Sequence, residues 1–258
     1  MTALQPSDSI RRIAPIDFRQ FAILLDVDGT LLDIAPTPGD VQVPAPLREI
    51  LQRLYERTGG ATALVSGRQV ADLDRIFAPL HLPAIGGHGA ELRLRADGGS
   101  AKKRASPLDP RVKARVIDIA RAGSEILVED KGYSVALHYR KAPELGRTLP
   151  DLVAAVCAEF EPAAIEVLPG KAVIEIKAAG INKGTALQEL MSYPPFAGRR
   201  PIFIGDDITD EAAFAVLPAY DGLGISVGRL LQGSSMSFDT PSEVRRWLDK
   251  ISGGGVAP

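Results

Sequence analysis

Short aliphatic runs recur along this chain, and polar or glycine residues follow each of them at once. The runs are FAILL (21–25), ATALV (61–65), LPAIG (82–86), RPIFIG (200–205) and GLGISV (222–227). Strands that are apolar on both sides are typical of a parallel sheet covered by helices on both faces. Stretches that favour helices lie between the runs, at 44–57, 69–79, 183–191 and 210–217. We therefore predict an α/β fold with a doubly wound, Rossmann-like parallel-sheet core.

Residues 107–178 follow a different pattern. Asp109-Pro110 is a typical start of a helix, and apolar residues at helical spacing follow it. A second helical pattern begins at Leu149, and alternating residues at 133–140 and 171–177 predict strands with one covered face. The sequence therefore predicts an inserted α+β domain at 107–178, within a core made of residues 1–106 and 179–258.

Composition and charge exclude several kinds of partner. Lysine and arginine number 30 against 32 acidic residues, so there is no basic surface for nucleic acid. The one cysteine, Cys157, cannot form an internal disulfide or a thiolate metal cluster. Neither a signal-peptide core nor a membrane-spanning stretch is evident in the sequence. We expect a cytoplasmic monomer without membrane or nucleic-acid partners.

Acidic side chains gather where the predicted strands end. Asp26 and Asp28 follow the first run, and Asp206 follows the fourth. In doubly wound sheets ligands bind at the carboxyl ends of the strands, so these three carboxylates should form an oxygen-rich site suited to Mg²⁺. Beside such a cation Asp26 can attack a phosphoryl group, and Asp28 can serve as acid and base. Taken alone, an Asp-x-Asp pair is more often a solvated turn.

Two further strand or helix ends carry groups that suit a phosphate. Ser66 offers a hydroxyl after the second run, and Lys183 places an ammonium at the start of a predicted helix. The segment GDDITDE (205–211) adds Asp207 and Asp210. Each feature has a plainer interpretation: a strand-to-helix turn, a surface lysine and a helix N-cap cluster.

Together and in this order, DVDGT (26–30), SGR (66–68), NKG (182–184) and GDDITDE resemble the motifs of the haloacid dehalogenase (HAD) superfamily of phosphatases. The resemblance implies that Asp26 is the nucleophile and Asp28 the acid and base. It implies phosphate contacts from Thr30, Ser66 and Lys183. It further implies metal ligation by Asp26, Asp206 and the backbone carbonyl of Asp28, with Asp207 and Asp210 holding the metal's waters or the lysine.

Longer blocks narrow the resemblance to one family. DVDGTLLDIAPTPGDVQV, ALVSGR, GGHGAELR, EDKGYSVALHYR, PGKAVIEIK and GDDITDEAAF are similar to the trehalose-6-phosphate phosphatases, over roughly residues 21–250. The resemblance implies that the insert is a cap that selects the sugar. It assigns sugar contacts to Glu129, Lys131 and Glu175, with Arg140 and Lys171 nearby.

The residues of the insert also have their own interpretation. Alternation in KAVIEIK (171–177) places Lys171, Glu175 and Lys177 on one face, which we expect to be exposed and able to bind sugar hydroxyls. A bulge at Gly132 could bring further charges to it. The plainer alternative is an ordinary solvated sheet face.

Other functions remain open at this point. A phosphatase for sucrose phosphate or mannosyl-phosphoglycerate would carry a similar cap, although the HGAE and GKxxxE blocks argue against it. A phosphomutase and a sugar-phosphate sensor without activity are the further alternatives. The intact set of Asp26, Asp28, Lys183 and Asp206 disfavours the sensor, because a sensor needs no nucleophile.

Overall fold

The computed structural model describes residues 16–35, 37, 39–97, 99–122, 125–160, 165–170 and 172–254 of the 258-residue chain. These residues form two compact units. The core unit consists of the described residues up to Lys103 and those from Asn182 onward, and the insert unit consists of Arg104–Ile181.

A mostly parallel sheet forms the centre of the core unit. Eight strands of the described part of the chain make up this sheet, in the order β12-β11-β10-β1-β2-β3-β4-β5. They are β1 (Phe21–Leu25), β2 (Thr62–Val65), β3 (Ala84–Gly86), β4 (Glu91–Arg93), β5 (Lys102–Lys103), β10 (Arg200–Gly205), β11 (Leu223–Val227) and β12 (Met236–Phe238). The pairs from β12 to β3 are parallel, and β4 and β5 are added antiparallel.

Strand order reverses at β1, which lies between β2 and β10. From β1 the chain continues to β2 and β3 on one side of the sheet, and later to β10, β11 and β12 on the other. Such a reversal is the switch point at which doubly wound sheets bind ligands. The predicted doubly wound fold is confirmed, and its switch point is the strand that ends at Asp26.

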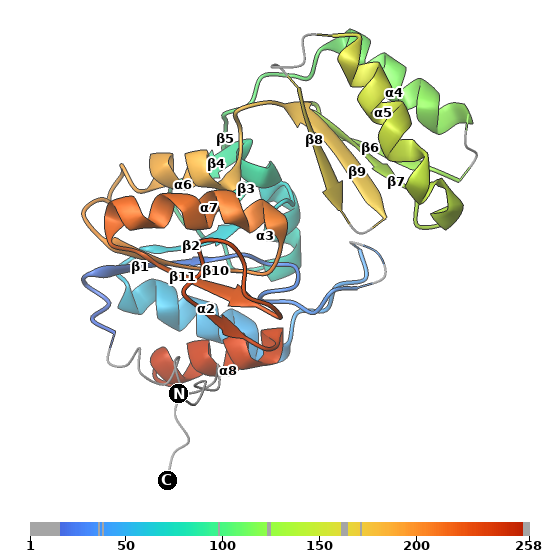
Figure 1. Cartoon of the computed structure of the whole chain (residues 1–258). Coiled ribbons are helices and arrows are strands. Elements are labelled where there is room, and N and C mark those ends of the chain that lie inside the picture. The colour runs from blue at the N-terminus through green and yellow to red at the C-terminus, as the bar shows by residue number, and fades with distance from the viewer. Residues whose placement is uncertain are drawn as a thin grey trace, which may run out of the picture. The chain divides into compact units, whose positions relative to one another are not determined.

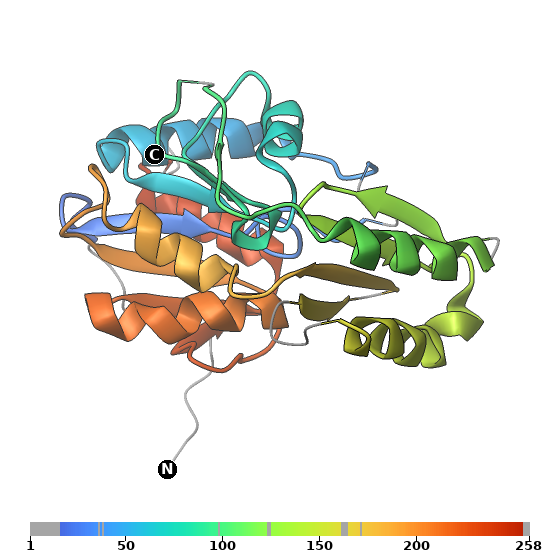
Figure 2. The same cartoon turned by 90° about the horizontal axis from the view of Figure 1, so that it is seen from above.

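Helices cover both faces of this sheet (Figure 1). They are α2 (Ala45–Arg57), α3 (Val70–Phe77), α6 (Lys183–Leu190), α7 (Glu211–Val216) and α8 (Pro241–Ile251). Ile23 and Leu25 of β1 belong to one apolar cluster with side chains of α2, α3 and α8, whereas Ala22 and Leu24 belong to another with side chains of α6 and α7. Figure 2 shows α6 and α7 side by side on their face of the sheet.

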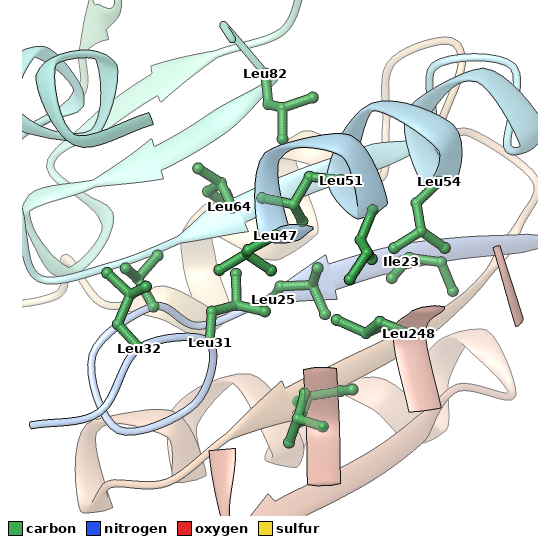
Figure 3. Close-up of a cluster of buried hydrophobic side chains, with 14 of the residues drawn as sticks. Ile23, Leu25, Leu31, Leu32, Leu47, Leu51, Leu54, Leu64, Leu82 and Leu248 are labelled. Atoms are coloured by element: carbon green, nitrogen blue, oxygen red, sulfur yellow. The ribbon is translucent and has the colours of Figure 1, made fainter. Parts of the chain in front are cut away.

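Helix α2 shows how the sequence specifies this packing. Its buried residues recur at helical spacing and form one apolar face, made of Leu47, Ile50, Leu51 and Leu54. Leu47, Leu51 and Leu54 lie over Ile23 and Leu25 in Figure 3. Full burial of one such side chain contributes about 1.5–3 kcal/mol relative to its exposure. This layer holds β1, and therefore the strand end, in place.

The sequence pattern does not predict β4, β5, β12 or α8. The three strands have three residues or fewer, too few for a periodic pattern to be recognised. Helix α8 does carry a start signal, because the Thr240 side chain accepts a hydrogen bond from the Glu243 backbone N–H and Pro241 begins the helix.

The insert unit is an antiparallel sheet with two helices on one face. Its sheet has the order β6-β7-β9-β8, and α4 and α5 pack on it through an apolar cluster that includes Ile174 and Ile176 (Figure 1). The elements are α4 (Pro110–Ala122), β6 (Leu127–Asp130), β7 (Ser134–His138), η3 (Pro143–Arg147), α5 (Leu149–Ala158), β8 (Ile165–Gly170) and β9 (Val173–Ala178). The predicted α+β composition is therefore found, with β6 and β8 as additional strands.

A turn takes the place of the bulge expected at Gly132. Strands β6 and β7 pair in regular register from Leu127 with His138 to Asp130 with Val135. The chain reverses between them, where the Lys131 backbone N–H donates to the Ser134 carbonyl at 3.0 Å and Gly132 has φ +86°. Glycine adopts this left-handed conformation without steric cost, so the hairpin closes without disturbing the alternation of either strand.

Within the described residues, no helix combines the length and the apolar character needed to cross a membrane.

Candidate active site

Asp26 extends strand β1 by one residue beyond its last ladder pair. Its backbone N–H donates to the Ile204 carbonyl of β10 at 2.9 Å, which fixes the position of the residue. The carboxyl group is buried, with only 4% of the residue exposed. A carboxylate in such a place is costly unless a cation compensates it, and a cation is present in Lys183.

Lys183 begins helix α6, and the sequence before it sets the start of the helix. The Asn182 side chain accepts from the Thr185 backbone N–H, and the Thr185 hydroxyl in turn accepts from the Asn182 backbone N–H. This reciprocal cap fixes the first turn. The Lys183 Nζ donates to Asp26 Oδ1 at 2.7 Å and to Asp210 Oδ1 at 2.6 Å, and all three side chains are buried.

The loop after β10 supplies two more carboxylates. Asp206 follows the strand directly, and Asp210 lies in the 3₁₀ turn η5 (Ile208–Asp210). Asp207 caps this turn: its side chain accepts from the Ile208 backbone N–H, and its own N–H donates to Asp210 Oδ2 at 3.0 Å. Asp210 is therefore held from two sides, by Lys183 and by the loop backbone.

Gly29 allows this loop to approach the turn after β1. It has φ +83°, and a Cβ atom at this position would overlap the carboxylate of Asp206. The neighbouring Thr30 is buried and donates from its hydroxyl to Asp206 Oδ1 at 3.3 Å. The DVDGT and GDDITDE segments are thus in direct contact, as the strand-end prediction requires.

Burial governs the ionisation of this cluster. It raises the pKa of Asp26 well above its ordinary value, an effect that Lys183 opposes. Burial and the neighbouring Asp210 carboxylate raise the pKa of Asp206 to about 6. Burial alone would lower the pKa of Lys183, but the carboxylates of Asp210 and Asp26 outweigh it and keep the lysine charged.

The acidic cluster fits a divalent cation. One carboxylate oxygen from each of Asp26, Asp206 and Asp210 lies within 4.8 Å of the others. When all three carboxyls are ionised, the ammonium of Lys183 leaves two negative charges uncompensated, and the metal-binding atoms are all oxygen, as hard cations prefer. Asp210 already accepts two hydrogen bonds, so Asp26 and Asp206 are the carboxylates that could hold a cation.

Asp28 has a different partner from Asp26. Arg68 approaches its carboxylate with two nitrogen atoms, Nε at 2.6 Å from Oδ2 and a terminal nitrogen at 2.7 Å from Oδ1. The Asp28 side chain is 37% exposed and the Arg68 side chain 13%. No function for Arg68 follows from the sequence, although this residue stands in the SGR motif beside Ser66.

Ser66 lies at the end of β2, where the following loop is supported by the end of β3. Its carbonyl accepts from the His88 backbone N–H at 3.0 Å, and its hydroxyl accepts from the Arg68 backbone N–H at 3.1 Å. The His88 ring packs so closely on Gly67 that a Cβ atom there would overlap it. His88 therefore packs against the SGR motif and does not belong to the acidic cluster.

The predicted sugar contacts in the insert unit are only partly grouped. Glu175 accepts from the Ser134 hydroxyl at 2.6 Å, and Lys131 lies 3.4 Å from both of its carboxylate oxygens. Glu129 instead pairs with His138 at 2.9 Å. This hydrogen bond, together with the charge of Lys131, lowers the pKa of Glu129 against the opposing effect of burial. Arg140 is exposed, and Lys171 lies outside the described residues.

The expectation of an exposed face of isolated charges is wrong. Glu175 and Lys177 are only 7% and 3% exposed. Both have partners on the same sheet, because Lys177 pairs with Glu166 at 2.9 Å and donates to the Ile181 carbonyl. Charged side chains at such burial are found almost only as pairs, and the alternating pattern by itself could not show which partners the other strands supply.

Comparisons with known proteins agree with this geometry. A family model described as trehalose-phosphatase matches residues 24–240. The chain is 42% identical to a probable trehalose-phosphate phosphatase of Sinorhizobium fredii (strain NBRC 101917 / NGR234), over 88% of this chain and 84% of that protein. It is 36% identical to a trehalose-6-phosphate phosphatase of Escherichia coli (strain K12), over 90% of this chain and 87% of that protein.

Among solved structures, the C-terminal domain of a trehalose-6-phosphate phosphatase from C. albicans has the same fold. The TM-score is 0.80 at 22% identity, and 97% of each chain is covered. The resemblance to the trehalose-6-phosphate phosphatases is thereby confirmed. The chain is a phosphatase, and it belongs to the trehalose-phosphatase family.

Proposed function

We propose that this enzyme hydrolyses trehalose 6-phosphate to trehalose and inorganic phosphate, with Mg²⁺, through an aspartyl-phosphate on Asp26. One observation carries the proposal: the buried carboxylate of Asp26 at the switch point of the sheet lies 2.7 Å from the Lys183 ammonium and forms an acidic cluster with Asp206 and Asp210. The two relatives compared above are named for phosphatases of this substrate, which supports the choice of sugar.

The cation would be held by the carboxylates of Asp26 and Asp206 and by the backbone carbonyl of Asp28. When bound, Mg²⁺ supplies positive charge that offsets the repulsion between these carboxylates and a phosphate dianion. Asp210 keeps Lys183 in place through the 2.6 Å contact, and Asp207 fixes Asp210 through its backbone.

In the first step Asp26 attacks the phosphorus atom. A bond forms between an Asp26 carboxylate oxygen and phosphorus, and the bond from phosphorus to the sugar oxygen breaks. Asp28 donates its proton to the leaving oxygen, so trehalose departs as a neutral alcohol. We assign Thr30, Ser66 and Lys183 to the phosphoryl oxygens. Their burial and their positions after β1, after β2 and at the start of α6 support this assignment.

In the second step water releases the phosphate. Asp28, now a carboxylate, takes a proton from a water molecule whose oxygen attacks the phosphorus atom. The acyl-phosphate bond breaks, Asp26 regains its carboxylate, and Asp28 is again protonated. Atoms and charges balance over the two steps, with one water consumed for each ester hydrolysed.

We further propose that the insert, predicted at 107–178, selects the sugar. Glu129, Lys131, Arg140 and Glu175, together with Lys171, are the proposed contacts to sugar hydroxyls. Glu175 is the strongest of the described candidates, since Ser134 and Lys131 hold its carboxylate in a fixed orientation. We also propose that the enzyme works as a monomer in the cytoplasm.

Phosphate release from a panel of sugar phosphates tests this function. Trehalose 6-phosphate should be hydrolysed with the highest kcat/KM, ahead of sucrose 6-phosphate, mannosyl-phosphoglycerate and glucose 6-phosphate. A higher kcat/KM for another sugar phosphate would contradict the proposed substrate, but not the proposed phosphatase mechanism. Isomerised sugar phosphate without free phosphate would indicate a mutase, and binding without turnover would indicate a sensor.

A further inference from the structure

The contact between Arg68 and Asp28 has the geometry of an orienting pair. Nε and a terminal nitrogen of the guanidinium lie 2.6 and 2.7 Å from the two carboxylate oxygens. Such a two-pronged contact restrains rotation of the carboxylate about its own axis, which a single hydrogen bond does not do. The orientation of the Asp28 carboxylate plane is therefore fixed by Arg68.

The arginine is mounted on a well-supported loop. Its backbone N–H donates to the Ser66 hydroxyl at 3.1 Å, and its carbonyl accepts from the Gly87 backbone N–H at 2.8 Å. These bonds tie the residue to the ends of both β2 and β3. The guanidinium is thus positioned by the sheet itself, and its side chain is only 13% exposed.

The turn that carries Asp28 is also fixed in its backbone. The N–H groups of Leu31 and Leu32 donate to the Val27 carbonyl at 2.9 and 2.8 Å, and Gly29 donates to Leu32 at 2.8 Å. What this backbone leaves adjustable is the torsion of the Asp28 side chain. Arg68 acts on that torsion from the loop after the adjacent strand β2, 40 positions further along the chain.

We propose, resting on the function proposed above, that Arg68 is a positioning residue that holds the Asp28 carboxylate in the orientation from which it exchanges protons with the leaving group and with water. Arg68 then contributes to turnover through Asp28. The competing role is direct contact with the substrate phosphate, as its place beside Ser66 would also allow.

A double-mutant cycle separates the two roles. Arg68→Ala should lower kcat by about tenfold to hundredfold with little change in KM, because orientation of a group that acts in the reaction is lost. Asp28→Asn should lower kcat further. The variant carrying both changes should match Asp28→Asn within about twofold, since Arg68 has nothing left to orient. The proposal would be overturned if the two losses in kcat multiplied in the variant carrying both changes, or if Arg68→Ala raised KM.

A second substrate and a chemical rescue experiment make the test independent of the proposed sugar substrate and of any folding defect. The cycle is run with p-nitrophenyl phosphate as well as trehalose 6-phosphate, so failure to hydrolyse the sugar phosphate would count only against the proposed substrate. Methylguanidinium added to Arg68→Ala should restore several-fold activity, and Arg68→Lys should recover part of it. The same additive should do nothing for the double variant, and rescue there would contradict an effect through Asp28.

Arg75→Ala is the matched control. Arg75 also pairs with an aspartate, Asp72 at 2.7 Å, but it lies on α3 with a side chain that is 77% exposed. Its kcat and KM should stay within twofold of the wild type, with no response to methylguanidinium. Unfolding midpoints of all variants, measured in parallel, distinguish a loosened loop from a misoriented carboxylate.

Discussion

The Nζ atom of Lys183 lies 2.7 Å from Oδ1 of Asp26, although the two residues are 157 positions apart in the chain. Both side chains are buried, so this contact joins the end of β1 to the first turn of α6 away from solvent. The same ammonium holds Asp210. A single cation therefore determines both the charge balance of the site and the approach of two distant segments.

Lys183→Met should destabilise the protein strongly. It leaves the buried carboxylates of Asp26 and Asp210 without their cation, and removal of one partner from such a group costs about 3–5 kcal/mol. The free energy of unfolding, measured with urea in metal-free buffer, should fall by that amount. Lys102→Met is the control: its partner is Glu189, its side chain is 67% exposed, and its effect should stay below about 1 kcal/mol. Equal stability of the two variants would show that the buried contact is dispensable.

Asp26→Asn should abolish turnover and leave the fold intact. The amide has the shape of the carboxylate but not its nucleophilic charge, so kcat for phosphate release should fall by about 10³-fold or more. Asp33→Asn controls for a change in the same segment, since the Asp33 side chain is 71% exposed. Mass spectrometry after an acid quench should detect phosphate on the peptide containing Asp26 in the wild type. Substantial turnover by Asp26→Asn would falsify the covalent mechanism.

The metal-free protein should lose stability as pH rises from about 4 to 6. Burial raises the pKa of Asp206 from its ordinary 3.8 to about 6, so the folded state binds this proton more tightly than the unfolded chain. The stabilisation that this proton gives the folded state is complete below the ordinary pKa of 3.8 and is lost as pH rises through the folded-state pKa of about 6. A difference of about 2 in pKa corresponds to about 3 kcal/mol.

Asp206→Asn isolates this contribution, because the amide does not titrate. The unfolding free energy of the variant minus that of the wild type should increase by up to about 3 kcal/mol between pH 4 and pH 7. Saturating Mg²⁺ should reverse the difference, since the wild type binds the cation better. A difference that does not vary with pH would mean that Asp206 titrates normally in the fold.

Removal of divalent cations should stop phosphate release. Activity should disappear after dialysis against a chelator and return on addition of Mg²⁺, because the acidic cluster otherwise repels the phosphate dianion. Titration calorimetry should show Mg²⁺ binding to the wild type and at least tenfold weaker binding to Asp206→Asn. Full activity of the dialysed enzyme would remove the metal from the proposed function.

Glu175→Ala should separate sugar recognition from phosphoryl transfer. Loss of a hydrogen bond from a charged group to a hydroxyl costs about 1.5–3 kcal/mol, which corresponds to about tenfold to hundredfold in kcat/KM for trehalose 6-phosphate. Hydrolysis of p-nitrophenyl phosphate should stay within a few-fold. Glu144→Ala, at an exposed position of the same unit, should change neither rate. An equal loss on both substrates would assign Glu175 a structural role through Ser134 and Lys131 instead.

The sequence allowed the main features of the core to be predicted because each of them is local. Runs such as FAILL, which are apolar on both faces of the strand, identify buried parallel strands. The topology of such sheets brings the carboxyl ends of these strands together. Topology therefore predicts that Asp26, Asp28 and Asp206 lie at one edge of the sheet, and the family resemblance adds Lys183 and Asp210. Strand order brings the strand ends together, but the contacts of Lys183 with Asp26 and Asp210 depend on side-chain geometry that the sequence pattern does not specify.

Pairings between distant segments could not be predicted in this way. Nothing in the SGR motif indicates that Arg68 binds Asp28, because the contact depends on how two neighbouring strand ends are spaced. For the same reason the sequence predicts a solvent-exposed Glu175. Alternation shows on which face of β9 this residue lies, but not that Ser134 and Lys131 contact it from the β6–β7 hairpin. Long-range partners decide whether such a charge is solvated or buried.

The position of β1 between β2 and β10 has a consequence for how the protein is made. Synthesis delivers β1 and β2 early, but the strand that completes the other side of β1 begins only at Arg200. Until then β1 has an open, strongly apolar edge with the potential nucleophile at its end, and such edges invite pairing with other chains. Lys183, Asp206 and Asp210 also emerge late. A ribosome-bound chain that stops before β10 should therefore lack phosphatase activity and depend on chaperones to stay unaggregated.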